Sequence, residues 1–237
     1  MKSVSVVIPA KDEEATIERV LKDLNKTIRG LKNYRFEVIV IDDNSSDKTG
    51  QIAKKYGALV IRNNGVCGKG NALKLGFKKA KGDIIVMMDA DYSHSPEDIP
   101  RFLQEIEKGA GFVIGSRCLG GSDEYTHIRS FGNVFLTMIF KVLMRKNLTD
   151  ALNGYKAFKK DVVKKYAYKS RTFEIEIELI ANALKEGMNI VEISSHERAR
   201  AGGKMKSNVI VHGPKFLWAI IKEGIKYNIH AITKGAR

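Results

Sequence analysis

The sequence contains little cysteine and little proline, and both shortages exclude whole classes of protein. Only two of its 237 residues are cysteines, Cys67 and Cys118, which lie far apart and lack the spacing of metal ligands. A small disulfide-bonded secreted domain is therefore excluded, and a reduced cytoplasmic chain is the simplest expectation. Four prolines, 21 glycines and no low-complexity tract also exclude a fibrous or disordered chain.

Long hydrophobic runs are absent as well. The most apolar segment, Val134–Met144, is interrupted by Lys141 and is too short to span a bilayer easily. The first eight residues pass directly into a strand pattern, so we expect no signal peptide. With 43% hydrophobic residues, the chain can nevertheless bury a sizeable core.

Acidic residues are outnumbered, since 27 Asp and Glu stand against 41 Lys and Arg and give a formal net charge of +14. Such an excess suits three partners: nucleic acid, an anionic membrane surface or phosphorylated substrates. The lysines are scattered, and no basic motif interleaved with aromatic residues occurs, which disfavours nucleic acid. We therefore expect no nucleic-acid partner.

The hydrophobic pattern predicts an α/β fold with a mostly parallel, doubly wound sheet, because strands and helices alternate along the first half. No linker-like break separates the halves, so the expectation is one domain over residues 1–237. The expected strands are Ser3–Ile8, Phe36–Ile41, Ala58–Ile61, Asp83–Met88, Gly111–Ser116, Gly154–Phe158 and Asn189–Ile193. The expected helices are Ala15–Arg29, Lys48–Tyr56, Asn71–Ala80, Pro96–Glu107, Arg129–Arg145, Glu174–Glu186 and a last one that Pro214 opens.

The most informative stretch is the end of the apolar run Asp83–Met88, where Asp89 and Asp91 follow with one small residue between them. Ligands of open α/β sheets bind outside the carboxyl ends of the strands. Two carboxylates there suit Mg²⁺ or Mn²⁺, hard ions that also bridge phosphates. A pair of solvated loop acids is the alternative. Ser95 and Pro96 next predict a capped helix start.

Two further loops should meet at the same edge of the sheet. The acidic segment Asp42–Asp47 follows the second strand, where carboxylates of other nucleotide-binding folds accept hydrogen bonds from a ribose or base. Capping of the next helix explains these acids equally well. The segment Gly65–Gly70 suits a phosphate cradle or a flexible turn.

Several ordered motifs resemble glycosyltransferase family 2. They are Val-Val-Ile-Pro-Ala-Lys-Asp-Glu13, Val-Ile-Asp-Asp-Asn-Ser-Ser-Asp47, Gly68-Lys-Gly-Asn-Ala-Leu73 and Met-Asp-Ala-Asp-Tyr-Ser-His-Ser-Pro-Glu97. Later motifs look like the subgroup that includes dolichol-phosphate mannose synthase, a polyprenyl-phosphate glycosyltransferase. These are Gly115-Ser-Arg117, Asp150-Ala-Leu-Asn-Gly-Tyr-Lys-Ala-Phe158 and Phe173-Glu-Ile-Glu176.

The resemblance implies a single-domain GT-A-type fold, a nucleotide-diphospho-sugar donor and a divalent metal, Mg²⁺ or Mn²⁺. It also implies that residues 1–118 form the nucleotide-sugar-binding half of the domain and residues 119–237 the acceptor-binding half. Two positions depart from the subgroup: Met205 replaces a serine of an Arg-x-x-Gly-x-Ser-Lys element, and Tyr92-Ser93 stands where a leucine and a glutamine are usual. The implied donor residues are Pro9, Ala10 and Glu13 at the nucleoside, Asp43 at the base or ribose, Asp89, Ala90 and Asp91 at the metal and diphosphate, and Arg200 and Lys206 at the phosphates.

The resemblance also implies the acceptor residues. Arg117 and Arg129 match the arginines that hold the acceptor phosphate, although either can also be read as a surface arginine. A lipid monophosphate is largely dianionic near neutral pH, so it needs cationic positioning rather than a general base. Asp150 would be a base for a hydroxyl acceptor, or else would order the Asn153-Gly154 loop. Asp91, Arg117, Arg129 and Asp150 are thus the expected catalytic set.

The leading hypothesis is an inverting, metal-dependent enzyme that moves a hexose from GDP-mannose or UDP-glucose to polyprenyl (dolichyl) phosphate. Helices over Val134–Met144 and Pro214–Ile232 combine apolar faces with lysines, which favours peripheral contact with the cytoplasmic face of a membrane; core packing is the alternative. A membrane-anchoring subunit is a further conceivable partner. The competing hypotheses are a soluble hydroxyl acceptor and, below it, a basic nucleic-acid-binding or regulatory protein with an inactive site.

Overall fold

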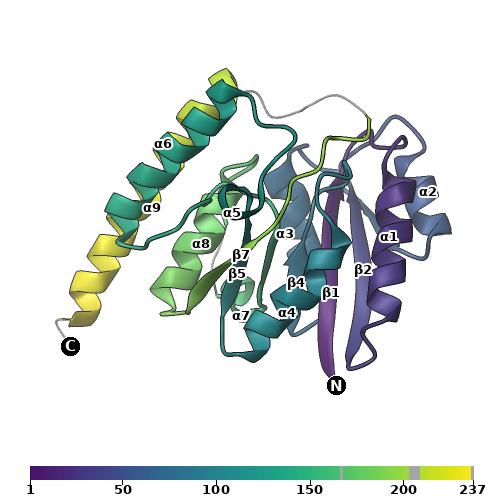
Figure 1. Ribbon diagram of the computed structural model, residues 1–237, viewed down its shortest axis with the longest axis horizontal. Helices are drawn as coiled ribbons and strands as arrows, with labels where there is room; N and C mark the ends of the chain where they lie inside the picture. Colours follow the sequence, from purple (N-terminus) through teal and green to yellow (C-terminus); the bar gives the residue numbers. More distant parts are fainter. Residues whose placement is uncertain (166–167, 203–208, 236–237) are drawn as a thin grey trace.

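The computed structural model describes residues 1–165, 168–202 and 209–235. Its centre is a seven-stranded sheet in the order β3-β2-β1-β4-β6-β5-β7, with helices on both faces (Figure 1). The strands are β1 Lys2–Ala10, β2 Tyr34–Asp42, β3 Leu59–Arg62, β4 Ile84–Met87, β5 Phe112–Ser116, β6 Lys156–Lys159 and β7 Ile190–Ser194. The helices are α1 Ile17–Arg29, α2 Thr49–Lys55, α3 Lys69–Lys79, α4 Ile99–Glu107, α5 Arg117–Gly120, α6 His127–Met144, α7 Asp161–Lys164, α8 Ile175–Lys185 and α9 Val209–Gly235, with the 3₁₀ turn η1 over Pro96–Asp98.

Two hydrophobic cores lie on opposite faces of this sheet, because successive side chains of a strand point to opposite sides. On β1, Val6 and Ile8 join α1 and α4 in one core, whereas Val7 joins α3, α6, α8 and α9 in the other. The central strands β1 and β4 are buried along nearly their whole length, as strands covered on both faces must be. The prediction of an α/β fold with a mostly parallel sheet is therefore confirmed.

One strand runs against the rest. β6 pairs antiparallel with both β4 and β5, while the other pairs are parallel. The residues before β6 consequently lie at the edge where the other strands end. Asp150 and Asn153 thereby join the loops that follow β1, β2, β4 and β5, and strands from both halves of the chain share one sheet. The division into a donor half and an acceptor half stays a prediction.

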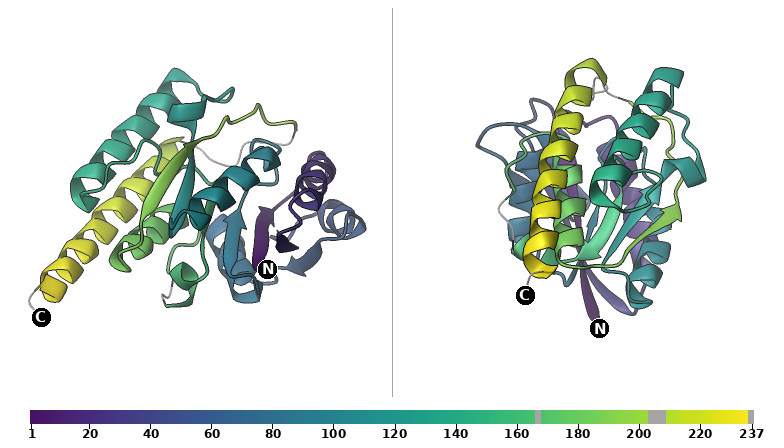
Figure 2. Two further views of the ribbon diagram at one scale, coloured as in Figure 1. Left: turned by 60° about the horizontal axis from the view of Figure 1, so that its bottom comes forward. Right: turned by 90° about the vertical axis from the view of Figure 1, so that its left-hand side faces the viewer.

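At the far end of the sheet from α1 and α2, helices α6 and α9 lie side by side and project beyond the other elements (Figures 1 and 2). Asn228 on α9 donates a hydrogen bond of 2.8 Å to the carbonyl of Leu143 on α6. A Cβ on Gly224 would come within 2.8 Å of the Leu143 Cβ, so the glycine permits this close helix crossing.

One expected helix start was wrong, and one expected side-chain cap is not formed. Pro214 lies inside α9, which already begins at Val209. A proline at this position has no N–H to donate to the carbonyl four residues earlier, so the helix continues with one backbone hydrogen bond fewer. Pro96 does open η1 as expected, but Ser95 makes no capping bond with its side chain. Its hydroxyl instead accepts a hydrogen bond of 2.7 Å from Arg198 Nη2.

Candidate active site

A cavity of about 640 Å³ opens at the edge where the parallel strands end. Its walls come from the loops after β1, β2 and β4, from the start of α3, and from α6 and α9. Of the twelve site residues that the sequence predicts, Asp150 does not reach the wall and Lys206 lies outside the described residues. The ten that line the cavity are Pro9, Ala10, Glu13, Asp43, Asp89, Ala90, Asp91, Arg117, Arg129 and Arg200.

Asp89 stands at the cavity wall directly after β4. Its Oδ1 lies 2.7 Å from Lys69 Nζ, and its backbone N–H donates to Nδ1 of His94 over 3.0 Å. Burial would raise the pKa of Asp89, but the positive charge of Lys69 outweighs it and holds the pKa below its ordinary value. The carboxylate therefore stays ionised.

Asp91 is held from two sides. Its Oδ1 accepts hydrogen bonds from the Ser93 N–H at 3.0 Å and the Ser93 hydroxyl at 2.6 Å, while its Oδ2 lies 2.6 Å from Arg200 Nη2. Arg200 also approaches Glu13 at 3.5 Å. We call Asp89, Asp91, Lys69 and Arg200 the carboxylate cluster.

The carboxylate cluster suits a hard divalent cation. Within the described ranges no group of three or more His, Cys, Asp or Glu side chains converges on one point, so the chain would supply one or two carboxylates. Mg²⁺ and Mn²⁺ are commonly bound in this way, with phosphate oxygens completing the coordination. Gly154 has no side chain, which lets Lys69 and Asp89 pack against its backbone, since a Cβ there would come within 2.7 Å of Lys69 Nζ and 3.1 Å of Asp89 Oδ2.

The acidic residues of the loop after β2 fit both readings of their sequence. Asp47 accepts from the N–H of Thr49, which is the capping role, while Asp43 lines the cavity. Asp43 also accepts from the Gly68 N–H at 2.7 Å and from Asn63 at 2.6 Å, so it ties the two loops together. Gly68 has a φ of 143°, a conformation that other residues rarely adopt.

Lys69 and Glu176 are site residues that interpretation of the sequence missed. Lys69 Nζ lies between Asp89 and Glu176, 3.1 Å from the latter, and Glu176 binds the fully buried Lys156 at 2.8 Å. Burial would lower the pKa of Lys69, but its two carboxylate partners raise the pKa above its ordinary value. Both residues lie inside motifs shared with the family, and this was the only feature of the sequence that could have identified them as site residues.

A second group, which we call the arginine cluster, is formed by Arg117, Asp150, Arg129 and Glu197. Arg117 binds Asp150 through Nε at 2.7 Å and Nη2 at 2.9 Å, and it lies 3.4 Å from Glu197. Asp150 is fully buried and also accepts from Asn133. Burial would raise the pKa of Asp150, but Arg117 keeps the pKa below its ordinary value.

These contacts correct the expectations for Asp150. Among the residues that the structure describes, the polar contacts of its carboxylate go to Arg117 and Asn133, so there it is neither placed to take a proton from an acceptor nor bonded to Asn153. Asn153 is ordered instead by His94 and by the Gly115 carbonyl. His94 is buried, and both of its ring nitrogens make hydrogen bonds.

Arg129 occupies the first turn of α6 and lines the cavity. Its nearest acid is Glu124, at 3.8 Å, and it makes a long hydrogen bond of 3.4 Å to the Glu124 carbonyl. It is thus held far more loosely than Arg117, and its guanidinium can take up an anion in the cavity with little loss of existing contacts.

The outer faces of α6 and α9 expose large apolar side chains. Phe131 is 73% exposed and Trp218 is 66% exposed, and the other members recur at helical spacing on the same faces. Within the described ranges no helix is both long and apolar enough to cross a membrane. The exposed members are Ile128, Phe131, Val134, Phe135, Met138 and Val142 on α6, and Val211, Trp218, Ile225, Ile229 and Ile232 on α9.

An α/β domain that gathers carboxylates and cations at the carboxyl ends of its strands has the general form of a nucleotide-handling enzyme. Comparison with known proteins narrows this class. The family model "Glycosyl transferase family 2" matches residues 5–167, and the chain belongs to that family.

Two curated relatives are archaeal. The chain is 30% identical over 227 residues to a dolichol-phosphate mannosyltransferase of Pyrococcus furiosus, which covers 92% of this chain and 64% of the relative. This chain thus spans less than two thirds of that relative's length. It is 29% identical to a dolichyl-phosphate hexose transferase of Haloferax volcanii, over 84% of each protein.

Among solved structures, glucosyl-3-phosphoglycerate synthase of Mycobacterium tuberculosis, in complex with Mn²⁺, UDP and phosphoglyceric acid, superimposes with a TM-score of 0.77. The match covers 94% of this chain and 78% of that one at 22% sequence identity, so it establishes the shared fold. The prediction of a GT-A-type fold is confirmed.

Proposed function

We propose that this glycosyltransferase moves a hexose from a nucleotide-diphospho-sugar, GDP-mannose or UDP-glucose, to a polyprenyl (dolichyl) phosphate. One observation carries the proposal: a single cavity is lined by the carboxylate cluster, by Arg117 and Arg129, and by residues of α6 and α9 whose outer faces are apolar. The carboxylate cluster suits a metal-bound donor diphosphate, the two arginines suit an acceptor phosphate, and the apolar helix faces suit a lipid chain.

The donor nucleoside would contact Pro9, Ala10 and Glu13 after β1, with Asp43 accepting from the ribose or base. Glu13 supports this pocket because its Oε2 accepts from Thr16, whose hydroxyl also donates to the Ala90 carbonyl over 2.8 Å. The loops after β1 and β4 are thereby linked beside the cavity. A nucleotide in this pocket directs its diphosphate toward Asp89 and Asp91.

Asp91 and Asp89 would hold Mg²⁺ or Mn²⁺, which supplies positive charge to the diphosphate that leaves during transfer. Arg200 supports the same role because its guanidinium already lies against Asp91. Lys206 is assigned to the phosphates on the motif alone. Lys69, fixed by Asp89 and Glu176, adds another cation at the cavity wall.

The acceptor phosphate would bind at the arginine cluster, chiefly through Arg129. One phosphate oxygen attacks the anomeric carbon on the face opposite the diphosphate; a new C–O bond forms as the bond to the nucleoside diphosphate breaks. This single displacement inverts the anomeric centre. No base is needed because the phosphate is already ionised, which agrees with the buried, fully bonded state of Asp150.

The apolar faces of α6 and α9 would lie in the headgroup region of the cytoplasmic membrane face, where the acceptor's isoprenoid chain is anchored. Lys215 and Lys226 on α9 are exposed and favour anionic lipids. The names of the two archaeal relatives support a lipid-linked acceptor. A membrane-anchoring subunit stays a prediction.

The proposal is tested by incubating the protein and Mn²⁺ or Mg²⁺ with each radiolabelled nucleotide sugar and either polyprenyl phosphate in vesicles or 3-phosphoglycerate. Label that enters the organic phase only when the lipid phosphate is present is the expected result. Label transferred to phosphoglycerate instead would replace the lipid acceptor with a soluble one, which the superimposed M. tuberculosis structure makes the second candidate.

A further inference from the structure

Tyr92, which follows Asp91, has an unusual backbone conformation. Its φ of 73° falls in the left-handed region, which a bulky side chain rarely adopts. Such strain persists only where the surroundings over-determine the conformation, and it concentrates at functional sites. The side chains on either side of it, Asp91 and Ser93, line the cavity, whereas Tyr92 does not.

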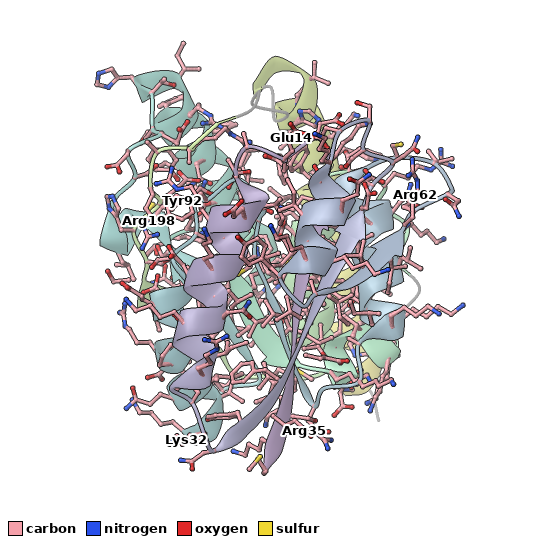
Figure 3. All side chains as sticks on the ribbon, turned by 90° about the vertical axis from the view of Figure 1, so that its right-hand side faces the viewer. Glu14, Lys32, Arg35, Arg62, Tyr92 and Arg198 are labelled. Carbon is pink, nitrogen blue, oxygen red and sulfur yellow. The ribbon has the colours of Figure 1, made fainter. Side chains whose placement is uncertain are left out.

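The tyrosine ring is held on the outer side of the loop, beside α1 (Figure 3). The guanidinium of Arg19 lies 4.6 Å from the ring centroid and that of Arg198 lies 5.1 Å from it. The hydroxyl donates to Asp23 Oδ2 over 2.8 Å. Two cation–π contacts and one hydrogen bond therefore fix the ring to α1 and to the segment after β7.

The segment after β7 is also bonded along its backbone to the loop that carries the two aspartates. The N–H of Arg198 donates to the Ser93 carbonyl over 2.9 Å, and the N–H of Ala201 donates to the Asp91 carbonyl over 3.3 Å. Arg200 lies between these two attachments, which explains how its guanidinium comes to rest 2.6 Å from Asp91.

We propose that Tyr92 is a positioning residue that clamps the segment 198–201 onto the Asp-x-Asp loop and so holds Arg200 at the donor diphosphate. This inference rests on the proposed donor site. The proposal also gives a role to a departure from the subgroup pattern. Tyr92, the residue after the second aspartate, acts from outside the cavity through Arg198 and Arg200. It does not contact the sugar.

Two substitutions separate the ring from the backbone. Asn tolerates positive φ, so Tyr92→Asn removes the ring while keeping the loop conformation; Tyr92→Phe keeps the ring and loses the hydroxyl. The matched control is Tyr56→Asn, because Tyr56 also donates to an acid of α1, Glu18 at 2.6 Å, and also lies under a cation, Lys22 at 5.6 Å, yet does not line the cavity.

Calorimetric titration with GDP and with UDP, each with Mn²⁺, measures the effect. We expect Tyr92→Asn to weaken nucleotide affinity by about tenfold, from the loss of two cation–π contacts, and Tyr92→Phe by about twofold or less. Tyr56→Asn should leave the affinity unchanged. Trypsin should cleave after Arg198 and Arg200 faster in Tyr92→Asn than in the control, since the segment is released.

A double-mutant cycle tests whether Tyr92 acts through Arg200. If it does, adding Tyr92→Asn to Arg200→Met costs no further affinity, whereas independent effects add. Additive losses, or unchanged affinity in Tyr92→Asn, would overturn the clamp. Should Tyr92→Asn fail to fold, Arg19→Met removes one cation from the ring without touching the loop, and unchanged affinity there has the same meaning. If the unaltered protein binds neither nucleotide, the donor-site proposal itself is wrong.

Discussion

The carboxylate cluster and the arginine cluster differ in where their main acids lie relative to the cavity. Asp89 and Asp91 reach the cavity wall, where they meet a ligand directly. In the arginine cluster Arg117 reaches the wall, whereas its partner Asp150 is fully buried behind it. A carboxylate at the cavity wall, such as Asp89 or Asp91, can exchange its cationic neighbour for a metal ion. A buried carboxylate such as Asp150 keeps its ion pair with the arginine. The same ion-pair chemistry thus supports ligand exchange in one cluster and fixed positioning in the other.

The largest effect should come from the carboxylate cluster. Asp91→Ala removes the direct ligand for the bridging cation, so we expect transfer and metal-dependent nucleotide binding to fall by at least about a thousandfold, on the order of the loss seen when a major charge-stabilising group is deleted. Asp89→Asn should weaken binding less. Calorimetry with and without Mn²⁺ measures both. Equal losses would make both aspartates direct ligands, and unchanged turnover in Asp91→Ala would contradict the metal assignment.

The arginine cluster should respond through stability. Asp150→Ala removes the main partner of Arg117, whose side chain is only 13% exposed at the cavity wall, and breaking a buried pair typically costs about 3–5 kcal/mol. Arg117→Ala should cost a similar free energy of unfolding, because it strands the Asp150 carboxylate. Urea denaturation measures each, and the double variant Arg117→Met with Asp150→Leu is the control that should recover much of the loss. A fully stable Asp150→Ala protein would refute fixed positioning.

Membrane contact is expected to depend on the exposed face of α9. Ile225 and Ile229 are 55% and 57% exposed, so changing both to Glu should leave the fold intact while releasing the protein from vesicles containing anionic lipid. Rising salt should also weaken the binding of the unaltered protein to these vesicles, as measured by sedimentation. The reason is that each lysine near the anionic surface contributes about 1 kcal/mol to binding, and salt screens this attraction. Val20→Glu is a contrasting variant, because Val20 is in the core and its change should unfold the chain. Continued sedimentation of the folded Ile225/Ile229 variant would assign the contact to α6 or to a partner.

Arg129→Ala should produce a smaller and more selective effect. Its nearest acid lies 3.8 Å away and no buried charge depends on it, so stability should change little. Loss of one cation from the acceptor pocket should reduce the use of polyprenyl phosphate by about tenfold, a loss typical of one charged hydrogen bond. Nucleotide titration should be unaffected. A matching fall in nucleotide affinity would place Arg129 in the donor site instead.

The smallest effect concerns acid stability. The folded-state pKa of Asp150 is below its ordinary value, so its pairing with Arg117 stabilises the fold above the unfolded pKa of about 3.9 and loses this contribution as pH falls through the lower folded value. The gap in unfolding free energy between the unaltered protein and Asp150→Asn should therefore be full at pH 7 and should narrow below about pH 4. Denaturation curves at pH 7 and pH 3 check this. A constant gap would mean that the carboxylate charge contributes nothing.

Much of the fold could be predicted from the sequence because its signals are local. Apolar runs such as Asp83–Met88 predict buried strands, and each expected strand overlaps an observed one. The antiparallel direction of β6 could not be predicted, since it depends on which neighbours the strand finds in the sheet. The early start of α9 was missed because proline usually marks the first turn of a helix.

The candidate site was predictable where a motif presents its side chain directly to the cavity, as for Asp89 and Asp91. It was not predictable where the role arises from partners distant in sequence. Glu176 meets Lys69 across more than one hundred positions, and Tyr92 depends on Arg19 and Arg198 from two other segments. Spacing along a chain carries no information about such pairings.

The exposed indole on α9 gives the membrane hypothesis a built-in optical reporter. Trp218 is the only tryptophan in the sequence, so the fluorescence excited at the red edge of protein absorption arises from one position. Because that indole is 66% exposed, its emission should start red-shifted in water and move to shorter wavelengths when the helix enters lipid headgroups. Lipids brominated at known depths quench tryptophan fluorescence, so they would measure how deeply α9 enters the membrane without any label or engineered residue.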